Sequence, residues 1–121
     1  MAHMYKYMMH EDYKKLTKVQ LRVLERMRTE TLILVHTEGV HTRCWLETID
    51  GEIKETIRKT TANALFALGA IQNIDPSEAP LYKPISSQRY FYHMLTPRYV
   101  ELQKRYANNR QTNNNTFLIN T

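Results

Sequence analysis

The clearest hydrophobic pattern in the chain predicts an amphipathic helix over residues 18–28. Apolar side chains recur there at helical spacing, at Leu16, Val19, Val23, Leu24 and Met27. Thr17 and Gln20 have the T-x-x-Q spacing of a capping box, in which each side chain bonds to a backbone N–H group of the other residue. The start of this helix is therefore predicted by a specific local contact as well as by periodicity.

Two strands and a hairpin are predicted after this helix. Residues 31–35 are β-branched or apolar and fit a buried strand, and residues 40–49 fit a second strand that carries Trp45. Asp50-Gly51 favours a hairpin, so residues 52–55 are expected to return along the second strand. A competing interpretation starts a long helix at Asp50, because one helical stripe also joins Ile53, Ile57, Thr61, Ala64, Leu65 and Leu68. We prefer the hairpin.

A second helix is predicted over residues 57–68, with Thr56 as its cap and Gly69 in the left-handed position that follows many helices. Its inward side chains are expected to be Ile57, Thr61, Ala64, Leu65 and Leu68. Its outward side chains are expected to be Arg58, Lys59, Thr60 and Asn63. Two cations in a first turn oppose the helix dipole, a small cost that an external anion can offset.

The rest of the chain predicts a hairpin and a final helix. Residues 71–95 are expected to form the hairpin, with a projecting tip bounded by prolines. Thr96-Pro97 is a typical helix start, and the last helix is predicted over residues 97–107. We expect three parts: a Met- and Tyr-rich segment over residues 1–15, one domain over residues 16–107 and an Asn-rich tail over residues 108–121.

Charge is distributed unevenly along the chain. The net charge is +5, and residues 81–121 carry six basic residues against Glu101 alone, whereas residues 1–80 are balanced. Five tyrosines are interleaved with this basic region, a combination that suits nucleic acid. An acidic protein partner and a merely solvated basic surface remain open as alternatives.

The chemistry-bearing residues do not predict an enzyme or a cofactor. No glycine-rich phosphate loop, nucleophile elbow or zinc-protease motif is present. His36, His41 and Cys44 lie close in sequence, but they lack a fourth ligand and a strand would separate them between two faces, so no metal site is expected. The single cysteine, the lack of an apolar membrane span and the lack of a secretory signal favour a cytoplasmic protein without a membrane partner.

The order of three motifs resembles the winged-helix family, the helix-turn-helix variant of small bacterial and phage DNA-binding proteins. The motifs are Leu16-Thr17-x-x-Gln20-x-x-Val23-Leu24, Ile57-Arg58-x-x-Thr61-x-x-Ala64-Leu65-x-x-Leu68-Gly69-Ala70-Ile71 and Tyr92-x-x-Leu95-Thr96-Pro97. The resemblance covers residues 16–106. It implies an α+β fold with about three helices, a small antiparallel sheet and a β-hairpin wing.

The same resemblance implies a DNA-binding protein, a transcriptional regulator of phage or mobile-element type that acts as a dimer. In that family the second helix of the motif enters the major groove and the wing touches the DNA backbone. Lys59 and Asn63 would then face base edges, and Arg58 and Thr60 would hold phosphates. Lys83 and Arg89 would be wing contacts, and Arg98 a backbone contact.

An alternative comes from the acidic residues before the second helix. Glu47, Asp50, Glu52 and Glu55 would be unfavourable beside DNA phosphates. They favour a non-enzymatic inhibitor or adaptor of phage type that uses the same fold to bind a host protein complex.

Overall fold

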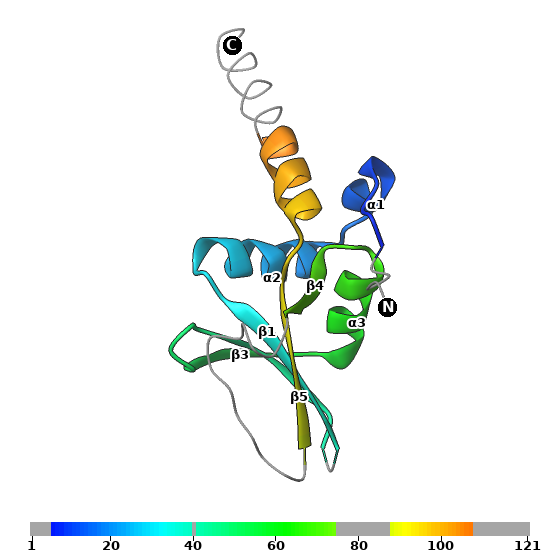
Figure 1. The fold of residues 1–121 in the computed structure, drawn as a ribbon. Coiled ribbons are helices and arrows are strands. Elements are labelled where there is room, and N and C mark those ends of the chain that lie inside the picture. The colour runs from blue at the N-terminus through cyan, green and yellow to red at the C-terminus, as the bar shows by residue number, and fades with distance from the viewer. Residues whose placement is uncertain (1–5, 40, 75–87, 108–121) are drawn as a thin grey trace, which may run out of the picture.

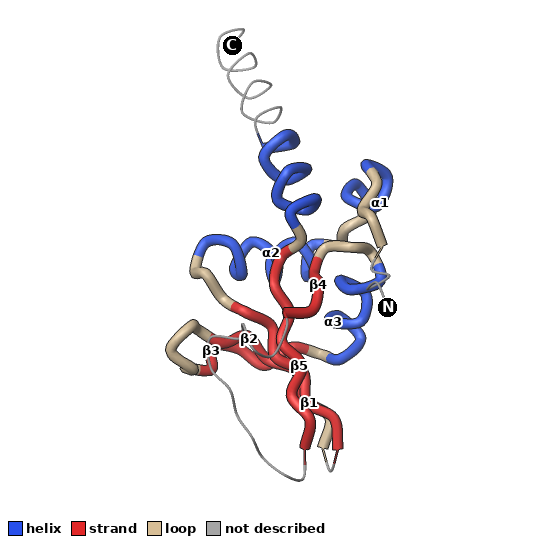
Figure 2. The backbone as a smooth tube through the Cα atoms, viewed as in Figure 1, coloured by secondary structure: helices blue, strands red, loops and turns tan. Residues whose placement is uncertain are grey.

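An antiparallel sheet of five strands carries helices against one of its faces (Figure 1). The structure is a computed structural model that describes residues 6–39, 41–74 and 88–107, together with the side chains of these residues other than 88 and 89. The elements are α1 (His10–Lys14), α2 (Lys18–Thr29), β1 (Ile33–Gly39), β2 (Arg43–Glu47), β3 (Ile53–Ile57), α3 (Lys59–Ala67), β4 (Ile71–Ile74) and β5 (Gln88–Leu95). A further helix covers residues 97–107 and projects away from the sheet (Figure 2).

The strands lie in the order β3-β2-β1-β5-β4, so β1 and β5 are internal although they are far apart in sequence. In the pairing of β1 with β5, Leu34 lies opposite His93 and His36 opposite Phe91. Successive side chains of a strand point to opposite faces, so Leu34 and His36 share the face that the helices cover.

The main core lies between that face and the helices. Its fully buried members include Leu34 and Leu46 of the sheet, Val23 and Leu24 of α2, and Leu65 of α3. A smaller cluster of Ile33, Val35 and Tyr92 occupies the opposite face, with Trp45, Tyr90 and Ile74 packed around it. Both faces of the internal strands are therefore buried, which is why β1 is apolar at consecutive positions.

The predicted capping box of α2 is confirmed. The amide of Gln20 donates to Thr17 Oγ1 at 3.1 Å, and the amide of Thr17 donates to Gln20 Oε1 at 2.9 Å. The following strand begins at Ile33 rather than at residue 31, because Thr31 adopts a left-handed conformation (φ 53°) between helix and strand.

The predicted hairpin at Asp50-Gly51 is also confirmed, and the competing long helix is wrong. Gly51 has φ 96° and donates its N–H to the carbonyl of Thr48, while Thr48 pairs with Glu52 across the turn. The next helix begins later than predicted because Ile57 still pairs with Cys44 as the last residue of β3. Arg58, not Thr56, is the N-cap of α3.

The buried face of α3 also differs from the prediction. Ala62 and Leu65 are its buried residues, whereas Thr61 and Ala64 are half-buried. The helix has nine residues, so two of the predicted inward residues lie outside it: Ile57 ends β3, and Leu68 is the C-cap.

The predicted pairing of a hairpin within residues 71–95 is confirmed, since β4 pairs antiparallel with β5. β5 also pairs with β1, however, so it is an internal strand of the sheet and not one side of a free wing. The expected hairpin tip lies outside the described residues, as do Lys83 and the tail.

Thr96 joins the end of β5 to the last helix and to α3. Its hydroxyl accepts from the amide of Tyr99 at 3.1 Å, the cap expected from Thr96-Pro97, and donates to the carbonyl of Gly69 at 2.7 Å. Gly69 has φ 81°, as predicted for the residue after a helix.

The N-terminal segment is packed into the same core rather than leading up to it. Met8 is fully buried and Tyr13 stacks on Tyr106 with ring centroids 4.8 Å apart. Asp12 caps α1 by accepting from the amide of Met9 at 2.9 Å, and Lys6 pairs with Asp12 at 3.0 Å. The described residues before position 16 therefore belong to the domain.

The α+β class and the antiparallel sheet are confirmed, with four helices in the described residues and five strands in the sheet. The winged-helix assignment stays a prediction. In a helix-turn-helix the two helices follow one another across a short turn, whereas three strands separate α2 from α3.

We predict that Gly69→Ala lowers the free energy of unfolding by about 2–4 kcal/mol, because strain at a positive φ adds to a steric clash. A Cβ at this position would lie 2.3 Å from the carbonyl oxygen of Lys6. Urea unfolding measures the effect. Gly51→Ala is the control, because Gly51 has φ 96° in the hairpin turn; equal losses in the two variants would contradict the role of the Lys6 contact.

Candidate functional site

The first turn of α3 is cationic and exposed. Arg58, Lys59 and Thr60 are all exposed, and no acidic residue lies in this turn. Arg58 makes no side-chain cap, so no capping side chain bonds to the first amide N–H groups of the helix. A helix start with these properties attracts anions through its backbone and its side chains together.

A groove of about 460 Å³ separates the start of α3 from α2. Arg58, Thr60 and Thr61 line it from the α3 side, and Val19 and Arg22 line it from α2. Two of the predicted site residues, Arg58 and Thr60, are therefore brought together, with Arg22 as a further cation that sequence analysis did not single out.

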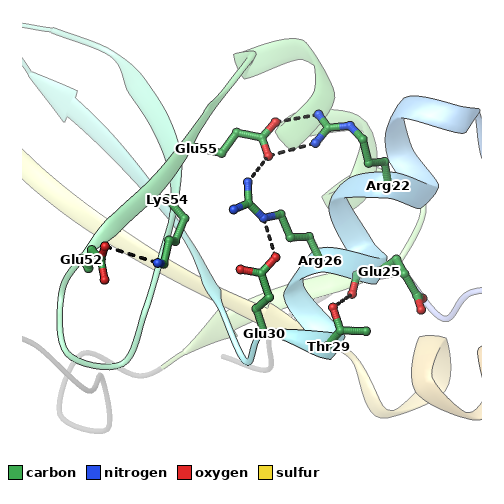
Figure 3. A network of polar contacts seen from close by, with 8 residues as sticks. All are labelled: Arg22, Glu25, Arg26, Thr29, Glu30, Glu52, Lys54 and Glu55. Atoms are coloured by element: carbon green, nitrogen blue, oxygen red, sulfur yellow. Dashed lines mark hydrogen bonds and ion pairs between the residues drawn. The ribbon is translucent and has the colours of Figure 1, made fainter.

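Arg22 and Glu55 of the groove lining belong to an ion network (Figure 3). Glu55 of β3 accepts from Arg22 at 2.9 and 2.6 Å and from Arg26 at 2.8 Å, and Arg26 also pairs with Glu30 at 2.6 Å. The hydrogen bonds from Arg22 and then Arg26 outweigh the effect of burial and lower the pKa of Glu55 to about 2. The carboxylate nearest to α3 is thus neutralised by its own neighbours.

The other acidic residues before α3 do not form one surface with Glu55. Glu47 is fully buried and accepts from the indole N–H of Trp45 at 2.9 Å. Glu52 pairs with Lys54 at 3.3 Å, and Asp50 lies in the exposed hairpin turn. These carboxylates therefore oppose an anionic partner at α3 less strongly than their closeness to α3 in the sequence suggests.

A second hollow lies on the other side of α3, between this helix and the sheet. It has a volume of about 380 Å³ and is lined by His36, Glu38, Ala62, Asn63, Phe66, Asn73, Phe91 and His93. Asn63 belongs to this cavity and not to the groove that Arg58 and Thr60 line. The predicted outward face of the helix is therefore divided between two sites.

The two histidines of the cavity form an aromatic cluster with the phenylalanines. The rings of His36 and His93 stack with centroids 6.4 Å apart, and Phe66 meets His93 edge-on at 6.0 Å. His93 is only 8% exposed, and its burial, followed by the proximity of His36, lowers its pKa to about 4. His93 is therefore a neutral imidazole at physiological pH.

Arg98, which was predicted to contact the DNA backbone, instead makes its polar contacts within the protein. Its Nε donates to the carbonyl of Met8 at 2.9 Å and it pairs with Glu101 at 2.7 Å. Its guanidinium carbon lies 4.6 Å from the centre of the Tyr7 ring, and its side chain is 14% exposed. These contacts hold the N-terminal segment against the last helix.

The predicted wing contacts are placed only in part. Arg89 lies opposite Glu38 in the pairing of β5 with β1. Lys83 lies outside the described residues.

His36, His41 and Cys44 do not converge. His36 and Cys44 are neighbours across β1 and β2, but Cys44 is buried, which raises the pKa of its thiol, and His41 lines a hollow with Thr37 and Trp45 on the opposite face. Within the described ranges, no group of three or more His, Cys, Asp or Glu residues is arranged to hold a metal ion. None of the described helices has both the length and the hydrophobicity needed to cross a membrane.

No protein-family model, curated protein or solved structure matches this chain. The interpretation of both sites therefore depends on their own geometry.

Sequence analysis missed the cavity because its walls come from distant segments. β1 contributes His36 and Glu38, and β5 contributes Phe91 and His93. The two-residue spacing within each pair indicates a shared face, but no local signal specifies that these strands are neighbours.

The ion network predicts a loss of stability in acid. Because folding lowers the pKa of Glu55 from 4.5 to about 2, its contribution is complete above pH 4.5 and is lost as the pH falls through 2. We expect Glu55→Gln to lower the free energy of unfolding by about 1–2 kcal/mol at pH 7. Urea unfolding between pH 7 and 2 should show this difference shrinking as the wild type loses its advantage.

Glu52→Gln is the matched control for this measurement, because Glu52 is 67% exposed in its ion pair with Lys54. We expect it to change stability little at any pH. A Glu55→Gln variant as stable as Glu52→Gln at pH 7 would contradict the network's role.

Proposed function

We propose that the protein binds double-stranded DNA and regulates transcription, in the manner of small regulators of phages or mobile elements. The observation that carries this proposal is the first turn of α3, where Arg58, Lys59 and Thr60 are exposed beside amide groups that no side chain caps. Backbone amides at a helix start and nearby cations are the groups that hold DNA phosphates.

This surface is assigned mainly contacts with DNA phosphates and fewer contacts with bases. Arg58 and Thr60 line the groove, so they can hold a phosphate that lies between α2 and α3, whereas Arg22 on the facing helix is paired with Glu55. Lys59, on the same exposed turn, is assigned the neighbouring phosphate or a guanine edge. Asn63 and Arg98 are no longer assigned DNA contacts, because Asn63 lines the cavity and Arg98 is bonded to Met8.

The hairpin of β4 and β5 keeps its proposed role as a second DNA contact, through Lys83 and Arg89. A homodimer would present two copies of α3 to half-sites one helical turn apart, about 34 Å. The winged-helix interpretation belongs to this proposal, with α3 as its recognition helix.

We predict that binding to a random-sequence duplex weakens steeply with salt, because phosphate contacts release counterions. Arg58→Ala and Lys59→Ala should each weaken binding several-fold and lower the salt slope by about one. Fluorescence anisotropy at low and high salt measures both effects.

Lys54→Ala is the matched control, because it removes the same charge from the exposed hairpin of β2 and β3. We expect it to leave the salt slope unchanged. Absence of duplex binding at low salt, or equal effects in all three variants, would rule out α3 as the DNA contact.

A second candidate function is that of a non-enzymatic inhibitor or adaptor that binds a host protein complex. It is favoured by an apolar groove of about 480 Å³, whose lining includes Met27, Ile49, Ile74, Met94 and Val100. Ile49 and Met94 are 50% and 42% exposed, which is unusual for large apolar side chains that lie together.

The two candidates are separated by variants on different surfaces. If a partner complex is the target, Ile49→Asp and Met94→Asp should abolish stoichiometric co-purification with that complex, whereas Arg58→Ala should retain it. The opposite pattern would exclude the apolar groove as the contact.

A further inference from the structure

The cavity between α3 and the sheet has the size of a small-molecule site. Its volume of about 380 Å³ falls within the range of ligand pockets in proteins. Three secondary-structure elements of the sheet and one helix supply its walls: His36 from β1, Asn73 from β4, Phe91 from β5 and Phe66 from α3. The walls therefore come from four elements that the fold brings together.

Two nitrogen atoms at this cavity are buried without a hydrogen-bond partner among the described residues. They are Nε2 of His36 and Nδ1 of His93. His36 Nε2 lies 3.7 Å from Glu38 Oε2, too far for a hydrogen bond. Both nitrogens lie beneath the surface of the cavity, so a ligand there meets the imidazole rings and not these two atoms.

The charge of the lining selects against anions. Glu38 is the charged residue of the lining, and its side chain is 43% exposed. No Lys or Arg is among the described residues that line the cavity. Among the described side chains of the lining, Glu38 would therefore repel a phosphate or a carboxylate, and none carries a positive charge that would hold it.

The remaining groups suit a flat ring with polar edges. Phe66 and Phe91 offer aromatic surfaces for stacking, and the rings of His36 and His93 extend that surface. The amides of Asn63 and Asn73 can each donate and accept a hydrogen bond. Asparagine amides and aromatic rings are the groups with which proteins bind nucleobases.

We infer that this cavity binds a small, uncharged, planar heteroaromatic molecule of the nucleobase type. The ring stacks on the aromatic side chains of the lining, and its edge bonds to the two asparagine amides. The inference does not depend on DNA binding, because the cavity and the cationic groove lie on different sides of α3.

The test uses the full chain and three probes, adenine, uracil and orotate. Orotate is uracil with an added carboxylate, so it isolates the effect of charge at constant ring shape. Heteronuclear NMR with labelled histidine and asparagine should show saturable shifts of the His36 and His93 imidazoles and of the Asn63 and Asn73 amides with adenine and uracil. Orotate should bind at least about tenfold more weakly than uracil, a difference of about 1.4 kcal/mol.

Variants locate the binding. Asn63→Ala should weaken adenine binding about fivefold, the effect of one lost hydrogen bond, and Asn73→Ala should act similarly. Both asparagines are exposed, so neither change removes core packing. Thr60→Ala is the matched control on the same helix, because Thr60 is exposed and lines the opposite groove.

Three results would overturn the inference: no saturable shift at millimolar adenine, orotate binding as tightly as uracil, or equal affinities for adenine in Asn63→Ala, Asn73→Ala and wild type. Arg58→Ala should leave adenine binding unchanged. Failure of the DNA proposal would therefore not be mistaken for failure of this one.

Discussion

The pairing of β1 with β5 is the contact on which the rest of the structure depends. Residues 40–87 lie between these strands in the sequence, yet each strand is the other's neighbour at the centre of the sheet. The pairing joins the β1-β2-β3 meander to the β4-β5 hairpin, and so makes one sheet from two local units. It also creates the wall of His36, Phe91 and His93, which neither unit has alone.

α3 is held in place from both ends, and this determines what its surface can present. Its start follows directly on β3, and its end is fixed by Gly69, whose carbonyl accepts from the hydroxyl of Thr96. The close approach of Lys6 to Gly69 adds the N-terminal segment to the same junction. With both ends fixed, Ala62 and Leu65 face the core, so Arg58 and Thr60 face one hollow and Asn63 faces the other.

Features set by neighbours in sequence could be predicted, and features set by distant pairings could not. The Thr17 and Gln20 caps, the turn at Gly51 and the left-handed Gly69 each depend on a few adjacent residues. The start of α3 was placed too early because Ile57 satisfies a helical stripe as well as a strand, and only its pairing with Cys44 decides between them. Arg98 was assigned to DNA because its charge is visible in sequence, whereas its contact with Met8, ninety residues away, is not.

The two hollows beside α3 differ in electrostatic character, and this difference would allow one short helix to serve the two proposed ligands. On the α2 side, Glu55 is held by two arginines, and Arg58 remains beside an uncapped helix start, so the local field favours an anion. On the sheet side, Glu38 and the neutral imidazole of His93 favour an uncharged ring. The helix itself separates the two environments, because Ala62 and Leu65 fill the space beneath it. A polyanion drawn to the first hollow therefore has no electrostatic reason to enter the second, and a neutral base gains nothing from the cations of the first.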